Sequence, residues 1–374
     1  MSQFVHLHVH TQYSLLDGQA SIAGLVDKAI ADGMPALAIT DHGNMFGIKE
    51  FTNYVKKVNG KTKGKISDAE KELAEAIAAN DTEKQVEKEA EIAKLKKKIL
   101  KPIIGCEMYV AQENLLEHVD KRDTGRHLIV LAKNETGYHN LIKLVSKAWT
   151  EGFYSHPRTD KHELAKHREG LIICSACLGG EIPRLLSAGR DAEADASVKW
   201  WKETFGDDYY IELQRHKATV TRANHDVYEA QMAIEPKLRA LAEKYNIKII
   251  ASNDVHFTNE DDAEAHDRLI CLSTNRLLND ESRMLYTKQE WLKTTDEMTR
   301  LFADIPEAIS NTLDICDKVE VYSIDHSPIM PNYEIPADFG TEEEYRHRLT
   351  EKDLFDEFTR DEHGNVVLNE EDAK

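Results

Sequence analysis

Three histidines near the start of the chain alternate with apolar residues in His6-Leu7-His8-Val9-His10. In a β-strand, alternate side chains point to the same face, so these imidazoles would lie together on one face. Two imidazoles spaced two residues apart can bind one metal ion from the end of a strand. Surface strands also contain this pattern. The other interpretation of the motif alone is therefore an ordinary strand whose histidines bind no metal.

Further residues with metal-binding side chains follow other predicted strands. Four strands carry such residues at or just after their carboxyl ends: His8 and His10, Asp41 and His42, Cys174 and Cys177, and Asp254 and His256. Active sites of parallel α/β barrels form at this end of the strands, so one shared metal site is the favoured explanation. Glu107 lies inside a strand, and His127 begins one, which is the wrong end for a parallel strand.

Several of these residues have ordinary alternatives. Glu107 could be a buried carboxylate that pairs with a base, and Asp17 before Gly18 is typical of a turn. Cys174 and Cys177 form a CxxC motif, which could be a redox pair or half of a structural zinc site. Because no second CxxC motif exists to complete a zinc ribbon, we favour Cys177 as a ligand and Cys174 as a packing residue.

The elements that must position these residues alternate between strand and helix. Strands are predicted at 4–9, 36–40, 103–110, 127–132, 171–174, 209–213 and 248–252, and helices after Ser21 up to Gly33 and at 138–149, 194–204 and 219–245. Such alternation favours a parallel sheet with helices outside it. We therefore predict an α/β fold, a distorted seven-stranded (β/α)7 TIM-like barrel with a small C-terminal extension.

Two stretches depart from this alternation. Residues 61–100 are mostly Lys, Glu and Ala, and they predict an inserted helical hairpin with a capping box at Ser67–Glu70 and a turn at Asn80-Asp81. A solvated surface hairpin is the simpler interpretation, and docking of a partner is the alternative. After about residue 285, short predicted helices at 295–302 and 305–318 lead into an extended and then a charged stretch, as expected if the chain stops partway into something larger.

Composition limits the class of protein. The chain has 374 residues, with 48 basic against 67 acidic ones, for a net charge of −19. This acidity argues against tight nucleic-acid binding by the chain's own surface field, although metal ions can reverse the field in a pocket. The sequence lacks a long apolar run and the layout of a signal peptide, and its five cysteines are scattered. These features predict a cytoplasmic protein with no membrane contact.

Six motifs in this order are similar to those of a known family: HLHVHTQYSLLDG, ALAITDHGNMFG, IIGCEMYV, HLIVLAKNETGY, CSACLGGEIP and ASNDVHF. They resemble the PHP (polymerase and histidinol phosphatase) domain, most closely the version at the N-terminus of bacterial DNA polymerase III alpha subunits. LFADIPEAISNT is similar to the stretch that joins this domain to the polymerase palm. The resemblance implies a PHP domain over 1–285 and a linker with the start of the palm over 286–374.

The resemblance also implies a ligand set, carried over position by position: His8, His10, Asp17, His42, Glu107, His127, Cys177, Asp254 and His256. Nine ligands imply a cluster of up to three divalent ions, and this mixture of donors suits Zn, Mn or Fe best. We expect metal-assisted phosphoester hydrolysis, with Asp41 and Asp254 orienting or bridging. Arg158 is a candidate phosphate clamp, or else a residue in a surface salt bridge.

In the parent polymerase, the implied substrate is a DNA 3′ end, which makes the domain a proofreading-type 3′–5′ exonuclease. The polymerase active site would lie beyond residue 374. The resemblance implies the rest of the alpha subunit as a partner, and it suggests a separate proofreading exonuclease subunit and the replicase holoenzyme as further candidates. The alternatives are a non-catalytic scaffold that docks that exonuclease, a stand-alone small-molecule phosphatase, and an amidohydrolase. Amidohydrolases carry a bridging lysine within a middle strand. Here Lys133 comes only after its strand, which disfavours the amidohydrolase alternative.

Overall fold

The structure is a computed structural model that describes residues 3–117, 123–331, 340–368 and 371. The chain separates into two compact units, residues 1–324 and 325–374. Residues 286–324, which the sequence analysis groups with the extension, thus belong to the first unit. The functional division at residue 285 stays a prediction. Within the described residues, no helix has the length and apolarity needed to cross a membrane.

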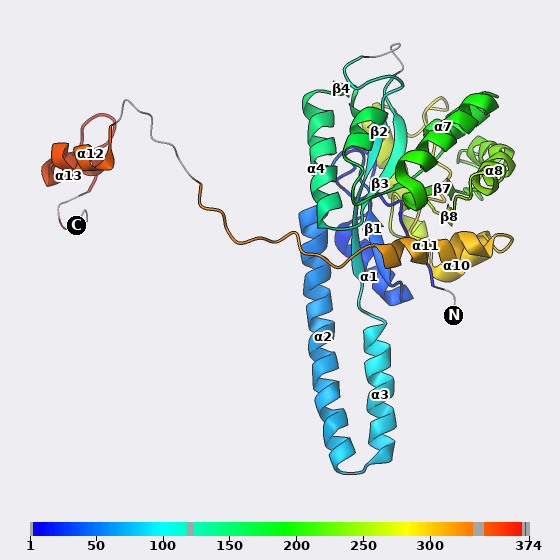
Figure 1. Cartoon of the computed structure of the whole chain (residues 1–374), viewed down its shortest axis with the longest axis horizontal. Coiled ribbons are helices and arrows are strands. Elements are labelled where there is room, and N and C mark those ends of the chain that lie inside the picture. The colour runs from blue at the N-terminus through cyan, green and yellow to red at the C-terminus, as the bar shows by residue number, and fades with distance from the viewer. Residues whose placement is uncertain (1–2, 118–122, 332–339, 369–370, 372–374) are drawn as a thin grey trace. The chain divides into compact units, whose positions relative to one another are not determined.

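A curled, mixed β-sheet forms the centre of the first unit (Figure 1). Its strands are β1 (Ala36–Ile39), β2 (Lys101–Val110), β3 (Arg126–Ala132), β4 (Phe153–Tyr154), β5 (His156–Thr159), β6 (Leu171–Cys174), β7 (Tyr209–Leu213) and β8 (Ile249–Ala251). They pair in the order β4-β5-β2-β3-β6-β7-β8, and β1 also pairs with β2. The pairs β1–β2, β2–β5, β6–β7 and β7–β8 are parallel.

Strand β3 runs in the opposite direction to its neighbours. It pairs antiparallel with β2 on one side and with β6 on the other. The α/β class predicted from the sequence is confirmed, but the expectation of an all-parallel sheet is wrong at this strand. The complete seven-stranded barrel is not confirmed. The reversal puts the start of β3 at the edge where the parallel strands end.

The first predicted strand, 4–9, is not regular in the structure and retains only a bridge between Val9 and Val255. It is nevertheless fixed on both sides by backbone hydrogen bonds. Thr40 N donates to Val9 O at 2.7 Å, and His10 N donates to Val255 O at 2.7 Å. The segment therefore lies between the end of β1 and the loop after β8, where its histidines can reach residues from both.

Helices lie outside the sheet of the first unit, and two short ones belong to the second. They are α1 (Ile22–Asp32), α2 (Ile48–Ala78), α3 (Thr82–Lys96), α4 (Glu135–Thr150), α5 (Lys161–Lys166), α6 (Glu181–Ser187), α7 (Asp191–Phe205), α8 (Asp226–Lys244), α9 (Ala263–Thr274), α10 (Thr295–Leu301), α11 (Pro306–Lys318), α12 (Glu342–Arg348) and α13 (Glu351–Thr359). Ser21 caps α1 through a bond from Gly24 N, and Gly33 ends it with φ +79°, as its sequence predicts.

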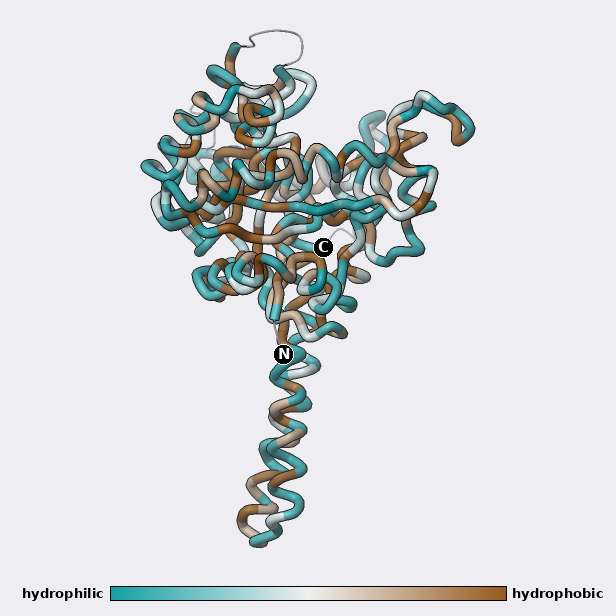
Figure 2. The backbone as a smooth tube through the Cα atoms, turned by 90° about the vertical axis from the view of Figure 1, so that its right-hand side faces the viewer, coloured by the Kyte–Doolittle hydropathy of each residue, from teal (hydrophilic) through white to brown (hydrophobic). Residues whose placement is uncertain are grey.

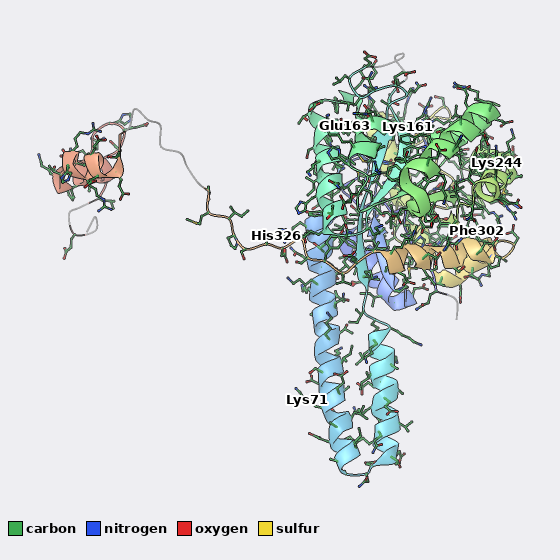
Figure 3. The ribbon with its side chains drawn as sticks, in the orientation of Figure 1. Lys71, Lys161, Glu163, Lys244, Phe302 and His326 are labelled. Carbon is green, nitrogen blue, oxygen red and sulfur yellow. The ribbon has the colours of Figure 1, made fainter. Side chains whose placement is uncertain are left out.

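The hairpin of α2 and α3 extends away from the sheet (Figure 1). Figure 2 shows hydrophilic positions along much of this hairpin and apolar ones concentrated in the body. Lys71 lies on the hairpin and is 74% exposed, far from Lys161 and Glu163 in the body (Figure 3). The turn at Asn80 is confirmed, but the capping box at Ser67–Glu70 is wrong because α2 runs through it without a break.

The two faces of the sheet are buried in separate clusters. Alternate residues of β3 divide between them, with Leu128 and Val130 in the larger cluster and Ile129 in the smaller one. The smaller cluster also contains Ile315 of α11, which packs against β8. Ile103 on β2 belongs to this cluster, and Glu107 lies four residues later, on the same face of the strand. This face of β2 is therefore apolar at Ile103 and carries the carboxylate of Glu107 nearer the end of the strand.

Replacing Ile129 with alanine should lower the free energy of unfolding by about 2–5 kcal/mol, because it leaves a cavity opposite Glu107 and Cys174. Urea denaturation followed by circular dichroism measures this. The matched control is Ile77→Ala near the end of α2, where the side chain is exposed and the cost should stay within about 0.5 kcal/mol. Equal costs for the two variants would contradict the central position of β3.

Candidate metal centre

The backbone around Asp254 turns sharply just after β8. Asp254 has a φ of +45°, in the left-handed region that asparagine and aspartate tolerate better than other non-glycine residues. Its neighbours are held by bonds from Val255 N to His8 O and from His256 N to Glu290 O. This turn directs the Asp254 carboxylate at the N-terminal histidines: Oδ1 lies 2.9 Å from His8 Nε2 and 3.2 Å from His10 Nε2.

Glu107 lies at the middle of the cluster and is fully buried. Its Oε2 lies 2.5 Å from His42 Nδ1 and 3.4 Å from His10 Nε2. Its Oε1 lies 2.7 Å from His127 Nδ1 and 3.7 Å from His8 Nε2. One carboxylate from β2 therefore meets four imidazoles that come from three separate parts of the chain.

The reversed direction of β3 brings His127 into this cluster. His127 is the second residue of β3, so in an antiparallel strand it lies near the carboxyl ends of the parallel strands. Cys177 comes from the loop after β6, and its Sγ lies 3.5 Å from His127 Nδ1. The loop conformation here includes a positive φ of 63° at Ala176, directly before the thiol.

Asp17 reaches the cluster from a loop that folds back on itself. Gly18 is required there, because a Cβ at this position would come within 2.0 Å of Thr11 O. Asp17 Oδ2 lies 2.9 Å from His42 Nε2 and 3.6 Å from His256 Nε2. Tyr286, which the sequence analysis did not single out, donates its hydroxyl proton to Asp17 Oδ1 at 2.8 Å.

The structure thus brings together all nine residues expected to bind metal. Among these nine residues, three groups have donor atoms within 4.8 Å of one another: His10, His42 and His256; His8, His10 and Glu107; and Glu107, His127 and Cys177. Asp17 and Asp254 join them through the contacts given above. Mixed imidazole, carboxylate and thiol donors are the types that Zn and other transition metals bind.

Unsatisfied buried atoms provide the test of whether a metal would fit. His8, His10 and His256 each use Nδ1 in a hydrogen bond, with Glu212, Ser14 and the carbonyl of Asp254 respectively. Their Nε2 atoms have no hydrogen-bond partner among the described residues, although carboxylate oxygens lie close by. Buried polar atoms without partners are costly. Short distances without hydrogen-bond geometry are expected where several donors share one ion, so the residues fit a metal.

The charges of the residues in the cluster depend on one another. Burial opposes the charged form of His8, but Asp254 and Glu212 beside it hold its pKa well above the usual value. Burial also opposes charge on His256, yet Asp17 raises its pKa to about 9. His10 differs: burial and the neighbouring His42 lower its pKa to about 3. Proton binding therefore partly replaces the charge that an ion would supply.

A second layer of polar residues orients the cluster. Glu212 Oε1 accepts from His8 Nδ1 at 2.6 Å, which fixes the ring so that Nε2 faces Glu107 and Asp254. The sequence analysis missed Glu212. The signal that could have found it is a lone acidic residue inside the apolar strand YYIEL.

Asp41 also belongs to this second layer. Its carboxylate accepts from Thr11 N at 2.7 Å and from Ser14 Oγ at 2.7 Å, and Ser14 in turn bonds His10. It is in none of the three donor groups. Of the two roles expected for Asp41, its contacts fit orientation through Ser14 and His10 rather than bridging of ions.

The structure does not bring Arg158 to the cluster. Its guanidinium is buried and donates to Gly152 O, to Leu115 O, and to the carbonyl and the carboxylate of Asp123. The bonds to Leu115 and Asp123 tie β5 to the chain before β3. The expectation that Arg158 clamps a phosphate is therefore corrected: the side chain is a buried structural cation rather than a ligand-facing one.

Other residues weighed from the sequence lie away from the donor groups. Cys174 is fully buried in the smaller core cluster, as expected for a packing residue. His6 is buried and hydrogen-bonded to Lys293 O. Lys133 pairs with Asp208 at 2.6 Å, away from the cluster.

A cavity of about 610 Å³ opens beside the cluster, in the size range of small-molecule and cofactor sites. Ligand-type residues on its wall are Asp17, His42, His127, Cys177, Asp254 and His256. The cluster is therefore reachable from outside although most of its members are buried.

A family model described as the PHP domain matches residues 6–216 of this chain, more than half of its length. The chain belongs to the PHP domain family. The matched range contains seven of the nine expected ligands, and Asp254 and His256 follow it.

The PHP chain is also similar to DNA polymerase III alpha subunits. It is 38% identical over 353 residues to the one of Borreliella burgdorferi and 38% identical over 360 residues to the one of Treponema pallidum. These alignments cover 93% and 95% of this chain but 26% of each relative, so the chain spans about a quarter of their length. The resemblance expected from the sequence is confirmed.

Two solved structures are similar to the PHP chain at a low level. An amidohydrolase from Chromobacterium violaceum matches with a TM-score of 0.35 and 12% identity, over 69% of this chain and 89% of that one. A candidate metal-dependent phosphoesterase from Bifidobacterium adolescentis matches with a TM-score of 0.34 and 14% identity, over 80% and 96%. These scores are too low to compare the folds in detail.

Replacing Glu212 with glutamine should weaken metal binding by the PHP domain by roughly 10–100-fold, because His8 loses the charged partner that orients it. Competition with a chelator measures the affinity. The control is Glu203→Gln, which removes an exposed carboxylate that lies 3.8 Å from Lys199. Equal affinities in all three proteins would contradict the orienting role of Glu212.

Metal binding by the PHP domain should strengthen as the pH rises from neutral toward 9. His256, with a pKa raised to about 9, and His8, with a pKa raised well above 6.5, hold protons that an ion must displace. As the pH rises, this competition disappears and the affinity increases. Calorimetry in buffers of different ionisation enthalpy counts the protons released, and release of none at neutral pH would contradict the expected proton load.

Proposed function

We propose that this chain is the metal-dependent phosphoesterase portion of a replicative DNA polymerase alpha subunit and that it hydrolyses the terminal phosphodiester of a DNA 3′ end. Membership of the PHP family and similarity to the polymerase subunits support this assignment. Because the chain spans about a quarter of those relatives, polymerase activity and contacts with other replication subunits are proposals about a larger protein.

One observation carries the proposal: the Nε2 atoms of His8 and His10 converge with the oxygens of Glu107 and Asp254, and the Nε2 atom of His256 lies 3.6 Å from Asp17 Oδ2. Each of these histidines is fixed through its other nitrogen. Second-layer bonds of this kind are typical of metal-binding histidines. We infer that the nine ligands hold up to three divalent ions of Zn, Mn or Fe. Bound ions polarise a phosphoryl oxygen and lower the pKa of water, so that hydrolysis proceeds near neutral pH.

The chain's own residues give the site its geometry. Glu107 holds four histidines in place from the middle of the cluster, and Asp254 aligns His8 and His10 from the other side. Asp17, with Tyr286 bonded to it, lies on the wall of the cavity beside His42. A phosphodiester that enters this cavity would meet the ligand-type residues on its wall.

Replacing both His8 and Asp254 with alanine should lower nuclease activity more than about 100-fold. Even changes to residues outside the ligand set of such sites lower metal affinity or activity by about 10–100-fold. The assay follows 3′–5′ shortening of a 5′-labelled single strand, at low salt, with added Mn or Zn. Low salt is needed because the acidic surface disfavours DNA. The control is His162→Ala, an exposed histidine of α5 that belongs to none of the groups of possible metal ligands among the described residues.

Metal content, measured on the same samples, separates the alternatives. Metal near three ions per chain, together with cleavage that the double variant lacks, supports the proposal. Bound metal without cleavage of DNA or of small phosphoesters would favour a structural cluster that stabilises the polymerase and docks a separate exonuclease. Absence of bound metal would overturn the metal centre itself.

A further inference from the structure

The cavity beside the metal-ligand cluster is bordered by exposed aromatic rings. Phe46 is 58% exposed, Trp149 is 43% exposed and Phe153 is 55% exposed, and all three line this cavity. Exposed large apolar residues that gather at one place mark binding surfaces, whereas scattered ones need no explanation. We call these three residues the aromatic rim.

The aromatic rim is an ordered row. The ring centroids of Phe46 and Trp149 lie 6.3 Å apart at an interplanar angle of 36°, and those of Trp149 and Phe153 lie 5.6 Å apart, stacked at 27°. Trp149 Nε1 donates to Gly43 O at 2.7 Å. This bond ties the row to the residue after His42, so the rings have a fixed position relative to the cluster before any ligand binds.

We propose that the aromatic rim is a stacking platform for the bases of single-stranded DNA whose terminal phosphodiester lies at the cluster. This inference rests on the proposed function and names how that site holds its substrate. Flat rings suit flat bases, and stacking accepts every base, as a proofreading site requires. Fixed rings also lose little conformational freedom on binding.

The charge of the chain favours binding through the bases over binding through phosphate contacts alone. With a net charge of −19, the surface repels a polyanion, so contacts that do not depend on phosphate charge must supply much of the affinity. The rings share one cavity with Asp17, His42 and Asp254. A protein partner seated on the rim is the other occupant, and the test below distinguishes it.

The test is binding of a fluorescently labelled oligothymidylate to the full chain, at low salt with EDTA, where turnover cannot occur. Phe153→Ala and Phe46→Ala should each weaken the affinity by roughly five- to a hundredfold, the range measured when single stacking rings are removed. Phe153→Leu keeps an apolar side chain without the ring, and it should lose nearly as much. Thermal unfolding confirms that these exposed changes leave the fold intact.

An oligonucleotide whose last nucleotides lack bases is the matched ligand control. The wild-type chain should bind it at least as weakly as Phe153→Ala binds the normal strand, and the substitution should not weaken binding of the abasic strand further. Tryptophan fluorescence should be quenched by the normal oligonucleotide in the wild type and unaffected in Trp149→Phe. Equal binding of normal and abasic strands, or unchanged affinity in Phe153→Ala, would overturn the platform and favour a protein partner on the rim.

Failure of the two proposals gives different results. Base-dependent binding without metal-dependent cleavage would refute hydrolysis and leave the platform standing. Cleavage that is equally efficient on normal and abasic ends would support hydrolysis and refute the platform.

Discussion

The buried carboxylate of Glu107 is the constraint on which the rest of the site depends. Burial by itself would raise its pKa, but His127 and His42 beside it hold the pKa well below the usual range. A buried charged carboxylate is costly in free energy unless it is paired. Replacing one of the surrounding histidines would therefore leave the charge of Glu107 partly unpaired. Because Glu107 lies within the longest strand of the sheet, its position is set by pairing on both sides of β2, to β1 and to β3.

Strand β3 shows how far the sequence could predict the fold. The apolar run at 127–132 predicts a strand at nearly its observed bounds, because burial on both faces leaves a clear pattern. Its direction is set by pairing with β2, the strand before it, and with β6, which follows only after α4, β4, β5 and α5, and the apolar pattern of β3 itself does not encode that direction. His127 therefore looks misplaced in a parallel arrangement, and the antiparallel strand resolves the difficulty by putting its start at the metal-ligand edge.

The site residues divide in a similar way. Ligands could be predicted because their side chains are chemically distinctive and because the family motifs are local. The roles of Arg158 and Glu212 could not, because each depends on a contact across the fold: Arg158 with Asp123 and main-chain carbonyls, Glu212 with His8. An arginine in a polar motif looks available for a phosphate until its donors are seen to be used. A glutamate in an apolar strand looks anomalous until its partner is known.

The same ligands would serve stability as well as chemistry. Segment 4–10, the end of β1 and the loop after β8 each contribute a donor to the group of His10, His42 and His256, so an ion shared by these three residues would cross-link the segments. Ions that bind only the folded chain stabilise it by mass action. A scaffold and an enzyme thus need the same cluster. They differ in what covers the aromatic rim, since an enzyme that holds a DNA strand there places bases against the rings, whereas a scaffold places a protein partner there or leaves the rings uncovered.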